Sequence, residues 1–130
     1  MRTHKRHAAA DLLVGALIER SGLAPREWLR GYLDAYLHPI VYLLYAHELK
    51  FSPHGENLIL VLKDAVPHRV ILKDIGEEVF LLGAGDDLPE ACERARSTEA
   101  DDTRNLGILS DVFDDFFRPL ALLLHGSGLV

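Results

Sequence analysis

A five-residue segment at positions 53–57 reads Pro-His-Gly-Glu-Asn and contains three side chains that could do chemistry together. The amide oxygen of Asn57 is a hard ligand of the kind that Mg²⁺ prefers, and His54 lies two residues before Glu56. The glycine between them lets the backbone approach a ligand closely. A further carboxylate, Asp74, follows the next apolar runs of the chain. These residue types predict a metal and phosphate site, with Asn57 and Asp74 as metal ligands.

A β-hairpin would bring these positions together. Two strand-like runs, Leu58–Lys63 and Arg69–Lys73, flank a turn expected over Asp64–Pro67. A hairpin centred on that turn pairs Asn57 with Asp74 at its open end, where antiparallel partners have Cα atoms about 4.5 to 5.5 Å apart. Spacing alone leaves an alternative open, in which the same side chains only cap a turn and end a strand.

Helices must surround this hairpin. Apolar residues at helical spacing predict a helix over residues 8–20 and a second from Pro25 to about Leu49, kinked at Pro39. The other expected elements are a strand over 79–82, a surface helix and loop over 86–102, and a helix over 106–124. This order predicts an α+β fold, in which long helices pack on a small antiparallel hairpin or sheet.

Composition limits the class of protein. The 130 residues are 48% hydrophobic and 26% charged, which fits a single globular domain over residues 1–130. The net charge of −6 argues against a nucleic-acid partner. No apolar run approaches the roughly 20 residues that span a bilayer, so no membrane association is expected. Cys92 is the single cysteine, which excludes an intramolecular disulfide and fits a cytoplasmic protein.

Longer stretches of the chain resemble a known family. The segments PHGENLILVL at positions 53–62 and KDIGEE at 73–78 look like the signature of the siderophore synthetases that act independently of nonribosomal peptide synthetases (NIS synthetases). These are also called the aerobactin synthase-like or IucA/IucC family, and the similar part is their C-terminal FhuF-like segment. Positions 28–37 and 111–118 match as well, so the resemblance covers nearly the whole chain. It is closest to the branch that makes alcaligin- and desferrioxamine-type hydroxamates.

The resemblance implies an ATP-dependent ligase that activates a carboxylate as an acyl-adenylate and then joins it to an amine or hydroxyl. It implies ATP and Mg²⁺ as cofactors, and carboxylate and amine or hydroxamate siderophore precursors as substrates. By the same resemblance, His54 is catalytic and contacts the nucleotide with Glu56, while Asn57 and Asp74 hold metal and phosphate. Members acting on citrate often have Glu at the position of Ser52, so the sequence argues against citrate.

Full members of the family are several times longer, and their other phosphate contacts lie upstream of the residues present here. The chain is therefore expected to be a C-terminal, palm- or thumb-like fragment with half a site, which needs an upstream synthetase half or forms a homodimer. A small-molecule phosphotransferase is a weaker alternative, because it would need Asp at position 56 and a glycine-rich lid. A third alternative is a non-catalytic remnant, or a module that binds a nucleotide or a partner.

Overall fold

The computed structural model describes residues 8–53, 56–83, 88–98, 103 and 105–129. In chain order, its elements are α1 (Ala8–Ser21), α2 (Pro25–His47), β1 (Leu49–Phe51), β2 (Leu58–Lys63), β3 (Val66–Leu72), α3 (Ile75–Glu78), β4 (Val79–Leu81), the 3₁₀ helix η1 (Glu90–Ala95), the π-helix η3 (Ile108–Phe117) and α4 (Arg118–Gly126). Helices and small antiparallel sheets are both present, which confirms the α+β prediction. None of the described helices is long and apolar enough to cross a membrane.

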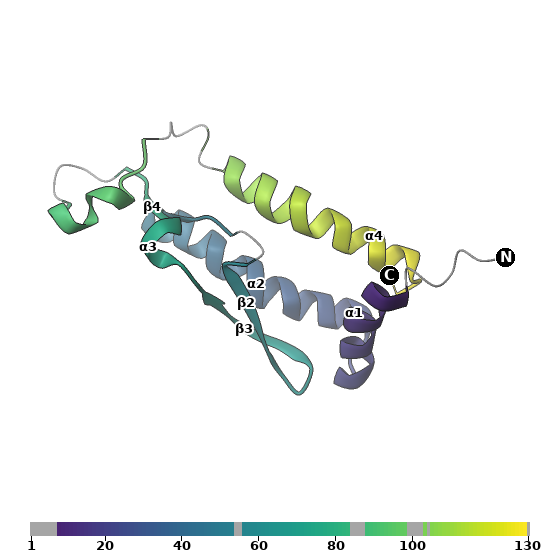
Figure 1. The fold of residues 1–130 in the computed structure, drawn as a ribbon. Helices are drawn as coiled ribbons and strands as arrows, with labels where there is room; N and C mark the ends of the chain where they lie inside the picture. Colours follow the sequence, from purple (N-terminus) through teal and green to yellow (C-terminus); the bar gives the residue numbers. More distant parts are fainter. Residues whose placement is uncertain (1–7, 54–55, 84–87, 99–102, 104, 130) are drawn as a thin grey trace.

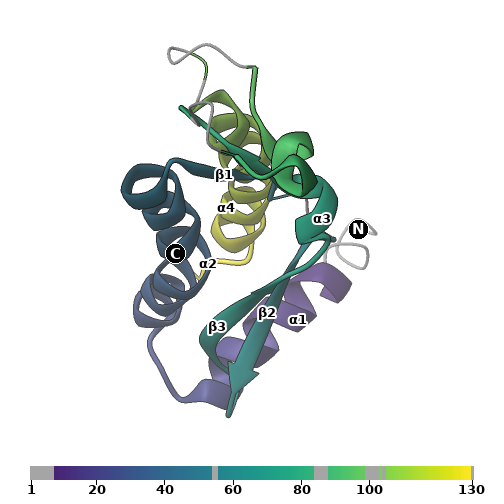
Figure 2. The ribbon, with the colours of Figure 1, turned by 90° about the vertical axis from the view of Figure 1, so that its left-hand side faces the viewer.

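Helix α2 lies between the β2–β3 hairpin and the η3–α4 segment in the view of Figure 1, and Figure 2 shows α2 at the left with the hairpin at the lower right. It begins at Pro25, whose fixed φ suits a first helical turn, and the Glu27 carboxylate accepts the Ala24 N–H at 3.3 Å. The helix continues through Pro39 and ends at His47, because Glu48 adopts a left-handed conformation with φ of 50°. It thus ends two residues before the expected limit.

The residues after α2 form a strand that the sequence analysis missed. β1 pairs antiparallel with β4, with Leu49 opposite Leu81 and Phe51 opposite Val79. Phe51 is among the most deeply buried side chains of the structure. This short sheet holds the end of α2 next to the segment that follows the hairpin. It thereby places residues 53–57 and 73–78, which carry the candidate site residues, side by side.

The hairpin has a tighter turn than predicted. Its turn is the pair Asp64-Ala65, both with positive φ, and Lys63 pairs with Val66. A bulge between Val61 and Leu62 then shifts the register, so that Leu58 pairs with Leu72. The predicted turn over 64–67 and the predicted pairing of position 57 with 74 are therefore wrong. The physical reason is Pro67, which lacks an N–H and sits buried at the bulge inside β3 instead of in the turn.

Aromatic rings join α2 to η3. Tyr32 stacks on Trp28 and Tyr36, and both tyrosines contact Phe116 with ring centroids 6.1 and 5.5 Å apart. Phe117 completes the cluster from the same segment. Burial raises the pKa of Tyr32 and of Tyr36, since a phenolate would lose its hydration there. The expected aromatic stripe of the second helix is thus the core on which the C-terminal helix packs.

The C-terminal helix is confirmed, in two parts. η3 is a π-helix, and α4 continues it from Arg118. Pro119 lies at the junction and cannot donate the backbone bond that would close an ordinary turn there. Of the surface helix expected over 86–102, the described residues contain the six-residue η1.

We expect Tyr32→Phe to leave the free energy of unfolding unchanged or raise it by up to about 1 kcal/mol. Among the described residues, the buried Tyr32 hydroxyl has no hydrogen-bond partner, so its removal relieves desolvation while the ring stacking stays. Trp28→Phe should instead destabilise by about 1–3 kcal/mol, because the indole N–H donates to the Ala65 carbonyl at 2.8 Å. Urea unfolding of both variants measures the difference. A destabilised Tyr32→Phe would contradict the conclusion that the buried Tyr32 hydroxyl has no hydrogen-bond partner in the described part of the chain.

Ala65→Gly should stabilise the chain by about 0.5–1 kcal/mol, because glycine adopts the observed φ of 65° without steric cost. Ala35→Gly, at a buried position inside α2, is the matched control and should destabilise by about 1 kcal/mol or more. Thermal unfolding shows whether each variant is more or less stable than the parent. A fall in stability for Ala65→Gly would mean that burial of its methyl group outweighs the backbone strain.

Candidate functional site

The segment at positions 53–57 is fastened at both ends to residues 73–78. At its start, the Ser52 N–H donates to the Glu78 carbonyl at 2.9 Å. At its end, the Lys73 N–H donates to the Asn57 carbonyl at 2.8 Å. The two segments that carry the candidate chemistry are thus joined by backbone hydrogen bonds, which do not depend on the side chains of the site itself.

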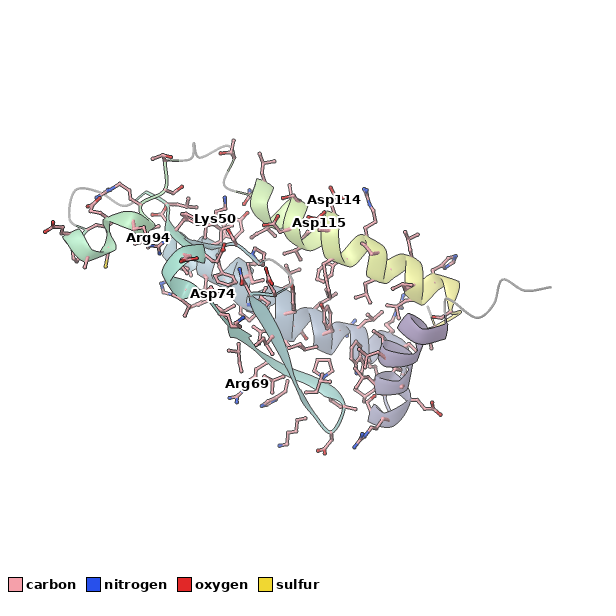
Figure 3. The ribbon with its side chains drawn as sticks, viewed as in Figure 1. Lys50, Arg69, Asp74, Arg94, Asp114 and Asp115 are labelled. Carbon is pink, nitrogen blue, oxygen red and sulfur yellow. The ribbon has the colours of Figure 1, made fainter. Side chains whose placement is uncertain are left out.

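Asp74 forms a tight turn after β3. It is in the left-handed conformation, with φ of 54° and ψ of 35°, and its carbonyl accepts the N–H groups of Glu77 and Glu78, each at 2.9 Å. Asp can adopt this conformation more readily than most residues. Figure 3 shows Asp74 at the open end of the hairpin, beside α3. The turn therefore places Asp74, Glu77 and Glu78 along the 53–57 segment, with Asp74 next to its end and Glu78 next to its start.

Lys73 connects the two segments through its side chain. Its Nζ lies 3.9 Å from Asp74 Oδ2 and 3.5 Å from the Glu56 carbonyl. The Asp74 side chain is 54% exposed, and Glu56 is also exposed. Because this ion pair is exposed, water screens it. The Asp74 carboxylate and the Lys73 ammonium therefore remain available to a bound ligand.

Asn57 differs from its neighbours because it is only 4% exposed. Pro53, at the other end of the segment, is fully buried, so both ends are anchored in the interior. The observed register places Asn57 opposite Lys73 instead of opposite Asp74, and among the described residues no hydrogen bond joins the two predicted metal ligands. His54 lies outside the described residues, so its place in the site stays a prediction.

The exposed oxygens fit a magnesium ion that is held mainly by phosphates. No group of three or more His, Cys, Asp or Glu in the described part of the chain is arranged to enclose a metal. Mg²⁺ bound with a nucleotide needs only one or two protein oxygens, because phosphates and water fill its other positions. The open carboxylate of Asp74 could supply one of them. A dedicated all-protein cage is therefore neither seen nor required.

Lys50 is a charged residue near the site that the sequence analysis did not single out. It lies on β1, two residues before Ser52, and is only 9% exposed. Its side chain extends to the start of η3, since a methyl group built at Gly107 would lie 3.0 Å from Lys50 Cε and 3.4 Å from Nζ. The sequence gives no sign of this contact, because Lys50 and Gly107 are 57 positions apart.

Comparison with known proteins identifies the family. Residues 26–130 match the family described as "Ferric iron reductase FhuF-like transporter". The chain belongs to this family. Among siderophore synthetases, the FhuF-like unit is the C-terminal domain, which confirms the resemblance seen in the motifs.

Relatives of this FhuF-like chain are siderophore synthetases. Over 112 residues it is 44% identical to putrebactin synthase of Shewanella sp. (strain MR-4), covering 86% of this chain and 18% of that protein. Over 70 residues it is 37% identical to aerobactin synthase of Escherichia coli, covering 54% and 12% of the two proteins. The solved structure of aerobactin synthetase IucC from Klebsiella pneumoniae superposes with a TM-score of 0.80 at 28% identity, covering 89% and 22%. The chain thus spans about a fifth or less of these relatives.

We expect Asp74→Asn to change the free energy of unfolding by less than about 0.5 kcal/mol. Its carboxylate is exposed, its pairing with Lys73 is long, and the turn is held by its backbone carbonyl, which asparagine retains. Asparagine also tolerates the left-handed conformation. Urea unfolding measures the change. A loss above about 1 kcal/mol would show that the carboxylate holds the turn, and would make this variant unsuitable for functional tests.

Proposed function

We propose that this chain is the C-terminal part of an ATP-dependent siderophore synthetase and supplies one side of its Mg-ATP site. The observation that carries the proposal is the double fastening of the 53–57 segment to residues 73–78, which holds the backbones that carry the predicted site residues Glu56, Asn57 and Asp74 next to one another. The similarity to putrebactin and aerobactin synthases supports it. Cytoplasmic ATP would serve such an enzyme, and the single cysteine requires no oxidising compartment.

In the proposed reaction, a substrate carboxylate attacks the α-phosphorus of ATP, and pyrophosphate leaves. An amine or hydroxyl of the second precursor then attacks the acyl carbon, AMP leaves, and an amide or ester forms. When bound, Mg²⁺ would neutralise part of the negative charge on the phosphates. Asp74, with Asn57, would orient that ion; Lys73 would contact a phosphate, and His54 and Glu56 would bind the nucleotide and the carboxylate.

The words in the family's description suggest another candidate, a ferric reductase. Iron–sulfur clusters are held by several cysteine thiolates. This chain has one cysteine, Cys92, which is exposed on η1. The candidate site instead holds carboxylates, an amide and a lysine, whose chemistry fits Mg²⁺ and phosphate. The ligase is therefore the better proposal for this chain.

The first test replaces the matched segment of Shewanella putrebactin synthase with this chain and measures pyrophosphate release that depends on ATP, Mg²⁺ and substrate. We expect Asp74→Asn to lower kcat/KM by about 10–100-fold, because a charged ligand of the metal becomes neutral. Asp64→Asn is the matched control, since Asp64 is also an exposed aspartate with positive φ, at the other end of the hairpin. It should leave kcat/KM unchanged.

An active chimera that tolerates Asp74→Asn would contradict the site, and an inactive chimera that is fully folded would favour the non-catalytic alternative. Calorimetry on the chain alone addresses the half-site. Mg-ATP should bind weakly to the parent, and Asp74→Asn should weaken that binding at least about tenfold, which is 1.4 kcal/mol. Equal binding by both would mean that the nucleotide sits elsewhere.

A further inference from the structure

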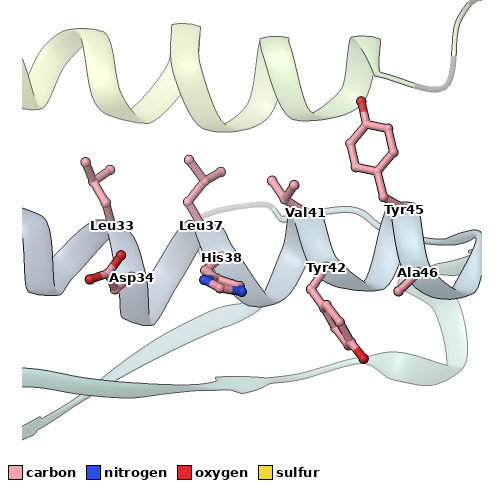
Figure 4. A pocket seen from close by; sticks show the side chains of 8 residues that line it. All are labelled: Leu33, Asp34, Leu37, His38, Val41, Tyr42, Tyr45 and Ala46. Atoms are coloured by element: carbon pink, nitrogen blue, oxygen red, sulfur yellow. The ribbon is translucent and has the colours of Figure 1, made fainter.

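One side of α2 carries a groove of about 620 Å³ with a mainly apolar lining (Figure 4). It is lined by Leu33, Asp34, Leu37, His38, Val41, Tyr42, Tyr45 and Ala46. All eight residues come from this single helix, so the groove follows the surface of α2 and is not an enclosed cavity. It is separate from the candidate nucleotide site, whose residues lie on the hairpin and α3.

The lining residues form two neighbouring rows, each with a spacing of four residues. Leu33, Leu37 and Val41 belong to one row, and Asp34 and Tyr42 belong to the other. Rows of this spacing are the ridges of a helix surface, and the channel between two ridges receives the ridge of a second helix. The lining spans fourteen residues, from Leu33 to Ala46, which is about 20 Å along the axis, or between three and four helical turns. The channel between the two rows is therefore long enough to receive several turns of a second helix.

The surroundings leave the groove open on one side. The row that starts at Leu33 points toward the η3–α4 segment in Figure 4, and the Tyr45 hydroxyl donates to Asn105 Oδ1 at 3.0 Å. Leu33 is nevertheless 41% exposed, and Tyr42 is 55% exposed. Large apolar and aromatic side chains along one helix face are a recurring feature of surfaces that bind a protein partner.

We propose that this groove receives an amphipathic helix from the rest of the synthetase polypeptide. The inference rests on the proposed function, because it assigns this chain to a longer enzyme. The chain spans only 18% of putrebactin synthase and 22% of the aerobactin synthetase structure, so in such proteins most of the polypeptide lies outside the matched unit. The apolar row would pack against the apolar face of the partner helix, and Asp34 would pair with a basic residue on it.

Charge disfavours a second copy of the chain as the occupant. The net charge is −6, so two copies repel each other at long range. In a symmetric contact through this groove, each copy would also bring its own Asp34 toward the other. A helix with a basic residue on its polar edge has neither disadvantage.

The test uses the putrebactin synthase chimera with a protease site inserted at the junction with this chain. After cleavage, gel filtration shows whether the two parts remain together. We expect the parts of the parent to co-elute, and those of the double variant Leu33→Asp, Tyr42→Asp to separate, with association weakened about 100-fold or more by the buried charges. Leu13→Asp is the matched control, at a leucine of α1 that is 66% exposed, and its parts should co-elute.

Continued association of the groove variant, separation of the parent, or separation of the Leu13→Asp control would each overturn the proposal. So would a dimer of the free chain that the groove variant abolishes, because the occupant would then be a second copy. Circular dichroism of the free chain shows whether the variants fold; both substituted residues are exposed. Pyrophosphate release by the uncleaved chimera tests the ligase separately: parts that associate as expected without ATP-dependent turnover would leave the docking intact and contradict the function.

Discussion

The burial of one face of α2 is the constraint on which the rest of this structure depends. Trp28, Tyr32 and Tyr36 occupy that face. The two tyrosine rings contact Phe116 and Phe117 of η3, and the Trp28 indole N–H donates to the Ala65 carbonyl in the turn of the hairpin. A two-stranded hairpin is marginal by itself in water and needs such a surface to pack on. Because one helix supports both neighbours, its position also determines where the open end of the hairpin lies.

The candidate site lies at that open end, where its segments are held largely by backbone bonds. The Ser52 and Lys73 amides fix the two ends of the 53–57 segment, and the Asp74 carbonyl fixes the turn that follows. The exposed carboxylate of Asp74 can therefore change without loss of the scaffold. This separation between what positions the site and what reacts in it makes a substitution such as Asp74→Asn informative about chemistry instead of stability.

The helices were predictable because their apolar residues recur every three to four positions, and α1, α2 and the C-terminal helix were found near their true limits. The hairpin was predicted to exist, but its register was wrong. A two-residue turn of this type is normally recognised by Asn-Gly or Asp-Gly, and here it is Asp64-Ala65. The positive φ of Ala65 occurs where its carbonyl accepts a hydrogen bond from Trp28. That contact joins residues far apart in the sequence, so no local pattern indicates it. Lys50 was missed for the same reason.

For the candidate site, the structure holds the backbone of Glu56 and Asn57 next to that of Lys73 and Asp74, although Asn57 and Asp74 are not facing strand residues, and their role stays a prediction. The electrostatics of that neighbourhood also explain why such a half-site would need more polypeptide. Glu56, Asp74 and Glu77 place three carboxylates there against the ammonium of Lys73, so this surface alone would repel a triphosphate. Magnesium offsets part of that repulsion. In the proposed enzyme, further positive charge would have to offset the rest, so nucleotide binding would depend on the surface that closes over this one.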